Sequence, residues 1–91
     1  MAVTVRIPTQ LRELSGGAAE LPTEGTTVVE VLKALEAAHP GFAERLFDDK
    51  GELRRFVNVF VADEDIRFLD GVNTPTPDGS TVSIVPAVAG G

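Results

Sequence analysis

One segment, residues 28–39, constrains the fold most because its apolar side chains occupy a single helical face. These side chains recur at i, i+3, i+4 and i+7, and they belong to Val28, Val31, Leu32 and Leu35. The neighbouring charged residues, Glu30, Lys33 and Glu36, lie off this stripe. A stripe that is only one face wide has to be buried against another element, and the most economical one is a β-sheet.

Both ends of this predicted helix carry boundary signals. Thr27, followed three residues later by Glu30, forms a capping box, and Thr26 is the neighbouring alternative N-cap. A Pro-Gly pair at positions 40–41 stops the helix near His39. A cation at the end of a helix complements the helix dipole, so His39 is predicted to cap the helix and not to bind a metal.

Alternation of apolar and polar residues predicts the strands of the sheet. The strongest signals are at residues 3–7, 56–61 and 80–85, and weaker ones are at 19–22 and 66–68. The resulting order is strand, strand, helix, strand, short strand, strand. One sheet covered by one helix on one face is a two-layer α+β domain.

The connections carry residues that are typical of turns. Residues 9–17 form a loop whose two leucines are predicted to tuck under the body, and residues 42–47 form a short helical turn. Residues 63–65 are predicted to turn the chain after the strongest strand, and residues 78–79 to form the last tight turn.

The alternation also predicts which residues lie on each face of the sheet. In residues 56–61 the three valines point one way, and Phe56, Asn58 and Phe60 point the other way. If the valines meet the helix, Phe60 lies on the open face beside Val85. We therefore predict a partner-binding surface made of Phe60, Val85 and Pro86. The alternatives are a loop that covers Phe60 and an inverted register.

The end of the sequence is the second candidate feature. Pro86 removes a backbone donor and ends sheet pairing, which predicts a folded domain of residues 1–86 and a flexible tail of residues 87–91. Glycines at the end can lie extended in a narrow channel. The residues predicted to thread into partner active sites are Val88, Ala89, Gly90 and Gly91. The alternative is a flexible chain end without a function.

Composition bounds the class of function. The net charge of −6 disfavours nucleic acid as a partner and suits steering towards a basic patch on a protein. The chain has no cysteine, which excludes disulfides, thiolate nucleophiles and thiolate metal sites. No apolar run approaches the roughly 20 residues of a membrane span, and the N-terminus lacks the order of a signal peptide. We expect a cytoplasmic protein that does not bind membranes.

Independent catalysis is disfavoured. Carboxylates at 48–49 and 63–65 lie in turn-like segments, where acidic residues commonly cap and solvate the backbone. No paired base, metal constellation or phosphate-binding loop accompanies them. We therefore expect no catalytic residue, no metal site and no cofactor bound by this chain.

The order of elements, ending in Val-Ser-Ile-Val-Pro-Ala-Val-Ala-Gly-Gly, resembles the ubiquitin-like sulfur carriers of the ThiS/MoaD superfamily. Leu-Arg-Glu-Leu at 11–14, followed by Ser-Gly-Gly at 15–17, looks like the Arg-Glu-Leu loop after their first strand. Residues 55–68 and the insertion at 42–53 are most similar to the CysO-type branch. The resemblance implies a ubiquitin-like β-grasp fold, with a mixed sheet, one main helix packed on one face and a projecting C-terminal tail.

The resemblance also implies chemistry at Gly91. An E1-like adenylating enzyme would use ATP to adenylate the Gly91 carboxylate, and a sulfurtransferase domain would supply the sulfur that makes a thiocarboxylate. In the CysO-type pathway a PLP-dependent synthase would accept the sulfur for cysteine synthesis, and a zinc metallopeptidase would release the cysteine. ATP, PLP and zinc would then belong to the partners, and the free carrier would be a monomer.

Two alternatives share the same terminus. The carrier could supply sulfur for thiosugar, thiazole or molybdopterin synthesis or for tRNA thiolation. It could instead be a ubiquitin-like protein modifier that is joined through Gly91 to lysines of target proteins.

Overall fold

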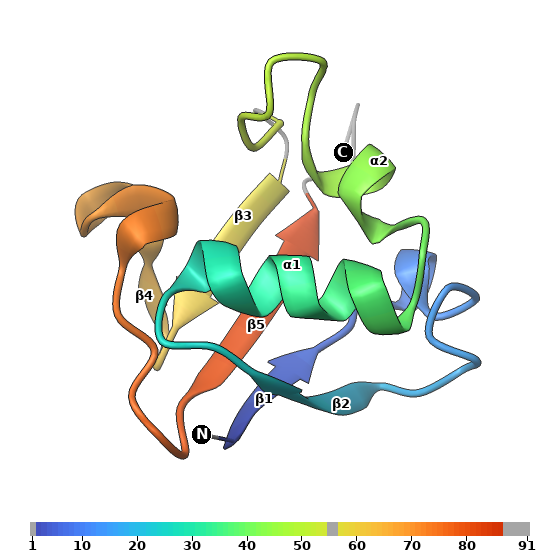
Figure 1. Cartoon of the computed structure of the whole chain (residues 1–91), viewed down its shortest axis with the longest axis horizontal. Coiled ribbons are helices and arrows are strands. Elements are labelled where there is room, and N and C mark those ends of the chain that lie inside the picture. Colours follow the sequence, from blue (N-terminus) through green and yellow to red (C-terminus); the bar gives the residue numbers. More distant parts are fainter. Residues whose placement is uncertain (1, 55–56, 87–91) are drawn as a thin grey trace.

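The computed structural model describes residues 2–54 and 57–86, whose strands form one sheet in the order β2-β1-β5-β3-β4 (Figure 1). The strands are β1 (Ala2–Arg6), β2 (Glu20–Glu24), β3 (Val57–Val61), β4 (Glu64–Asp65) and β5 (Thr81–Pro86). The helices are α1 (Val28–Ala38) and α2 (Phe42–Leu46), and the 3-10 turns are η1 (Thr9–Leu11), η2 (Ile66–Phe68) and η3 (Gly71–Asn73). β1 and β5 run parallel and the other pairs are antiparallel. The predicted mixed sheet with one main helix is confirmed.

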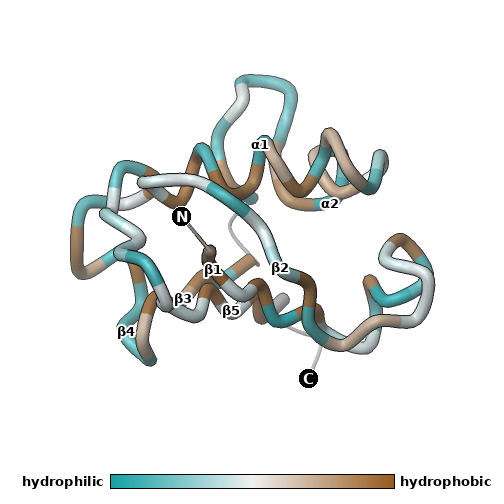
Figure 2. Tube along the Cα trace, turned by 60° about the horizontal axis from the view of Figure 1, so that its bottom comes forward, coloured by the Kyte–Doolittle hydropathy of each residue, from teal (hydrophilic) through white to brown (hydrophobic). Residues whose placement is uncertain are grey.

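The two helices lie together on one side of the sheet (Figure 2). The apolar stripe of α1 is buried, and its four residues are at most 2% exposed. The apolar residues of the first alternating segment are buried as well: Val3 and Val5 of β1, and Ile7, which follows it. Leu11 of the first loop is also buried, and Leu14 packs against this core, as predicted.

The start of α1 differs slightly from the predicted capping box. Thr27 is the N-cap, and its hydroxyl accepts the backbone N–H of Glu30 at 3.4 Å. The Glu30 carboxylate reaches one residue further back and accepts from the Thr26 amide at 3.0 Å and its hydroxyl at 2.9 Å. The hydrogen bond from the Thr26 backbone, followed by that from its hydroxyl, lowers the pKa of Glu30. Both threonines therefore share the capping role.

Gly25 is required where the chain passes from β2 into this helix. A Cβ at this position would lie 2.7 Å from the backbone nitrogen of Val31 and 3.0 Å from the carbonyl carbon of Glu30. Because both contacts are with backbone atoms, no side-chain movement could relieve them. The glycine allows the end of β2 to approach α1 closely.

The turn after β3 was predicted at the wrong residues. The chain turns at Ala62 and Asp63, which both have positive φ (51° and 71°), and Glu64–Asp65 already forms β4. Two residues with positive φ suit a tight two-residue hairpin. Glu64 and Asp65 are therefore left to pair with β3. Residues 66–68, predicted as a short strand or its remnant, form the 3-10 turn η2, because the Asp65 carboxylate caps it through the Arg67 amide at 2.9 Å.

β2 extends two residues beyond its predicted end at Pro22. Pro22 lies opposite Thr4 within the β1–β2 ladder, and β2 is an edge strand of the sheet. A proline is tolerated there because the missing N–H can face away from the neighbouring strand.

Candidate functional site

The open face of the sheet, opposite the helices, carries Phe60 and Val85, two of the three residues predicted to bind partners. Val57, Val59 and Val61 are buried at 2%, 1% and 7% exposure, so the other face of β3 presents Asn58 and Phe60. This confirms the predicted register. We call Arg6, Asn58, Phe60, Ser83 and Val85 the open face.

Cross-strand register places these side chains relative to one another. Ser83 of β5 lies opposite Phe60 on one side and opposite Arg6 on the other, and Val85 lies opposite Asn58. Phe60 and Val85 are therefore diagonal neighbours on adjacent strands, about 7 Å apart. Phe60 is half-buried, whereas Val85 is 45% exposed. Val85 is thus the more accessible apolar residue of the predicted patch.

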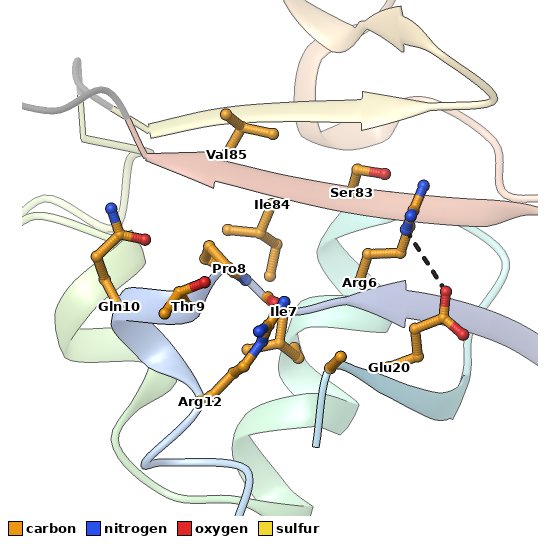
Figure 3. A pocket seen from close by; sticks show the side chains of 11 residues that line it. Arg6, Ile7, Pro8, Thr9, Gln10, Arg12, Glu20, Ser83, Ile84 and Val85 are labelled. Carbon is orange, nitrogen blue, oxygen red and sulfur yellow. Dashed lines mark hydrogen bonds and ion pairs between the residues drawn. The ribbon is translucent and has the colours of Figure 1, made fainter. Parts of the chain in front are cut away.

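The open face continues into a shallow hollow beside the end of β5. Its volume is about 570 Å³, and side chains from β1, η1 and β5 surround it (Figure 3). Arg6 forms an ion pair with Glu20 of β2 at 3.5 Å, with both side chains more than half exposed. Arg12 donates from Nε to the carbonyl oxygen of Ile7 at 3.1 Å. The hollow combines guanidinium groups with the apolar side chain of Val85.

Sequence reasoning did not assign this hollow. Arg6 could have been found, because it is the outward position at the end of the first alternating segment. Arg12 could not have been found, because it reaches the hollow only through the 3-10 turn η1, which follows β1. Arg67 also reaches the open face and donates to Asn58 Oδ1 at 2.9 Å. A chain with a net charge of −6 therefore presents three arginines around this face.

The root of the predicted tail is held by the middle strand of the sheet. β5 lies between β1 and β3, and its last residue, Pro86, lies opposite Val57. The predicted tail, residues 87–91, lies outside the described residues, and with it the predicted threading residues Val88, Ala89, Gly90 and Gly91. The threading role and the boundary stay predictions.

The other candidate residues have structural roles. His39 is the C-cap of α1, and its backbone N–H donates to Leu35 O at 2.8 Å. The Asp48 carboxylate accepts from the amides of Glu52 and Lys50, and these two hydrogen bonds lower the pKa of Asp48. Within residues 2–54 and 57–86, no three histidine, cysteine or carboxylate side chains cluster so as to hold a metal ion. None of the helices in that part of the chain has the length and apolar character needed to cross a membrane.

Known proteins are similar to this chain in sequence and in fold. The ThiS family profile matches residues 5–91. The sulfur carrier protein CysO of Mycobacterium tuberculosis is 50% identical over 93 residues, which cover 100% of both chains. Small archaeal modifier protein 3 of Haloferax volcanii is 44% identical over 68 residues, which cover 75% of this chain and 73% of that protein. A chain in the crystal structure of the Amycolatopsis orientalis BexX/CysO complex superposes with a TM-score of 0.93 at 47% identity, covering 99% of this chain and 100% of that one.

Proposed function

The chain belongs to the ThiS family and is 50% identical to a sulfur carrier protein, and we propose that it carries sulfur as a thiocarboxylate on Gly91. The observation that carries this proposal is the 50% identity to CysO, in an alignment that covers 100% of this chain and so includes its Gly-Gly ending. The fold supports it, because β5 is fixed by strands on both sides and leads directly into the tail.

The proposed reaction takes place on the backbone terminus and not on a side chain. An E1-like enzyme transfers AMP from ATP to the Gly91 carboxylate, and pyrophosphate leaves. The terminal sulfur of a persulfide on a sulfurtransferase domain then attacks the carbonyl carbon, and AMP leaves. A thiol of the donor cleaves the resulting acyl disulfide, which releases the Gly91 thiocarboxylate and leaves a disulfide on the donor. The chain's contribution is to present an unobstructed carboxylate, since neither Gly90 nor Gly91 has a Cβ. The absence of cysteine from the sequence avoids internal thiol exchange with the carried sulfur.

The acceptor that we propose is a PLP-dependent synthase that makes cysteine, with a zinc metallopeptidase releasing the product. The identity to CysO supports this branch. A structure that pairs a CysO with a second protein, BexX, supports the general idea that such carriers dock onto other proteins. ATP, PLP and zinc would all be bound by those partners.

A second candidate is a protein modifier joined through Gly91 to lysines. The similarity to a small archaeal modifier protein favours this candidate. Sulfur supply to the thiazole, molybdopterin, thiosugar or tRNA pathways stays an alternative acceptor for the carrier. Isopeptide-linked adducts in cells, found without abundant thiocarboxylate, would support the modifier.

The carrier proposal predicts a change in intact mass. After incubation with ATP, an E1-like enzyme and a sulfur source, the chain should gain about 16 Da, one oxygen replaced by sulfur, and fragmentation should locate the gain at Gly91. An unchanged mass with an enzyme that loads its own carrier would contradict the proposal.

The open face should be needed for this loading. We expect Phe60→Asp to lower the affinity for the activating enzyme at least tenfold, because it places a charge within an apolar contact. Asp65 lies opposite residue 60, so the new carboxylate also faces a like charge across the strands. Phe60→Ser removes the aromatic ring without this repulsion and serves as the matched variant. Titration calorimetry should show weakened binding for both variants, with unchanged far-UV circular dichroism. Wild-type affinity in the serine variant would reject the role of Phe60.

A further inference from the structure

Phe68 is the most exposed large apolar side chain among the residues that the structure describes. It is 87% exposed, and its neighbour Leu69 is 41% exposed. Single exposed apolar residues are ordinary on protein surfaces, but two adjacent ones form a small patch at one edge of the sheet. We call Phe68 and Leu69 the η2 anchor.

Several contacts fix the backbone that carries the η2 anchor. Ile66, two residues before Phe68, is buried at 1% exposure. The Leu69 amide donates to the carbonyl oxygen of Ile66 at 3.0 Å. The Asp70 amide then donates to the hydroxyl of the buried Thr74 at 3.1 Å. A phenyl ring on a fixed backbone loses little conformational entropy when a partner covers it. The anchor is therefore preorganised for docking.

The η2 anchor lies towards the same end of the sheet as the root of the tail, separated from β5 by β3. The Arg67 guanidinium donates to the carbonyl oxygen of Val57 at 2.9 Å, and Val57 lies opposite Pro86. η2 thus runs back from the β3–β4 turn at the outer edge of the sheet, where Figure 1 shows the orange segment beside β4. β4, from which η2 continues, is two strand spacings from β5, which is about 10 Å. A protein that receives the tail would lie within reach of Phe68.

Exposed acidic residues flank the η2 anchor along the chain, and we call them its acidic border. Asp63, Glu64 and Asp70 are all exposed, and they precede and follow the anchor in the chain. Arg67 is drawn towards β3 by its contacts with Asn58 and Val57. The chemistry that complements this surface is an apolar socket bordered by lysine or arginine side chains.

We propose that the η2 anchor is a second docking point for the adenylating enzyme, which would hold Phe68 in such a socket while the tail occupies its active site. This inference rests on the proposed carrier function, because adenylation is the step that every later use of Gly91 requires. The anchor and the tail together would fix the carrier at two points, so the tail enters the active site in one orientation.

The test measures adenylate formation by the full chain with its adenylating enzyme, at varied carrier concentration. We expect Phe68→Ser to raise KM for the carrier at least tenfold and to change kcat less than about twofold, because the ring binds but takes no part in the reaction. Glu64→Lys should also raise KM. Glu24→Lys makes the same charge change at the opposite edge of the sheet and should leave KM unchanged. Phe68 is too exposed for its loss to unfold the domain, which a melting curve would verify.

The outcomes separate this inference from the proposed function. A wild-type chain that is loaded with sulfur, together with a Phe68→Ser variant of unchanged KM, would overturn the anchor and leave the carrier function intact. Equal effects of Glu64→Lys and Glu24→Lys would overturn the acidic border. A wild-type chain that does not bind the adenylating enzyme would overturn the anchor, and failure to gain sulfur with any active enzyme would overturn the carrier function.

Discussion

Gly91→Ala should lower kcat/KM for thiocarboxylate formation by about 100-fold or more, because a methyl group displaces the terminal carboxylate in the adenylating site. A displacement of about 1 Å at a reacting group is enough for a loss of this size. The loss should fall mainly on kcat, since the open face and the η2 anchor still bind the enzyme. The measurement is pyrophosphate release together with intact mass after addition of the sulfur source.

The control for this prediction is stability. Residue 91 follows the last described strand by five positions, so the variant should unfold at the wild-type temperature. Comparison with Phe68→Ser then separates a defect in chemistry from a defect in docking. Thiocarboxylate formation by Gly91→Ala at the wild-type rate would show that the active site does not require glycine at the terminus.

Phe42→Ala should lower the free energy of unfolding by about 3–5 kcal/mol, the usual cost of truncating a buried phenylalanine. Phe42 begins α2 and is fully buried, together with Leu46 one turn later. A domain of this length is stable by about 5–14 kcal/mol, so the variant would lose a large share of its stability. Urea denaturation at 25 °C measures the change directly.

The chain offers a matched control for this substitution. Phe68→Ala removes the same atoms at a site that is 87% exposed, and it should change the free energy of unfolding by less than about 0.5 kcal/mol. The contrast tests whether α2 is part of the core. Similar effects of the two variants would mean that α2 is not packed as the structure describes.

The sequence predicted the elements that are defined by periodicity. The stripe of α1 and the alternation in β1, β3 and β5 depend only on which residues face the core, so they could be assigned without coordinates. The open face followed from the same alternation, because burying the three valines of β3 leaves Phe60 on the other side.

The chain between β3 and β5 could not be predicted in the same way. Strand periodicity assigns Ile66 and Phe68 to one face, whereas the 3-10 turn buries Ile66 at 1% exposure and leaves Phe68 at 87%. The change depends on the turn at Ala62 and Asp63, where a left-handed conformation of alanine has no local sequence signal. Because this turn sets where the Asp65 cap lies, the η2 anchor became visible only in the structure.

The parallel pairing of β1 with β5 has a mechanical consequence. These strands lie near the two ends of the chain and are adjacent in the sheet, with Thr4 opposite Thr81 and Arg6 opposite Ser83. A force that pulls the tail away from the N-terminus would load their interstrand hydrogen bonds in shear, all at once, and not one after another as in unzipping. An unfoldase that grips the tail would thus meet its highest resistance at the first strand pair. A carrier that passes its terminus through successive enzymes would keep its fold under such tension.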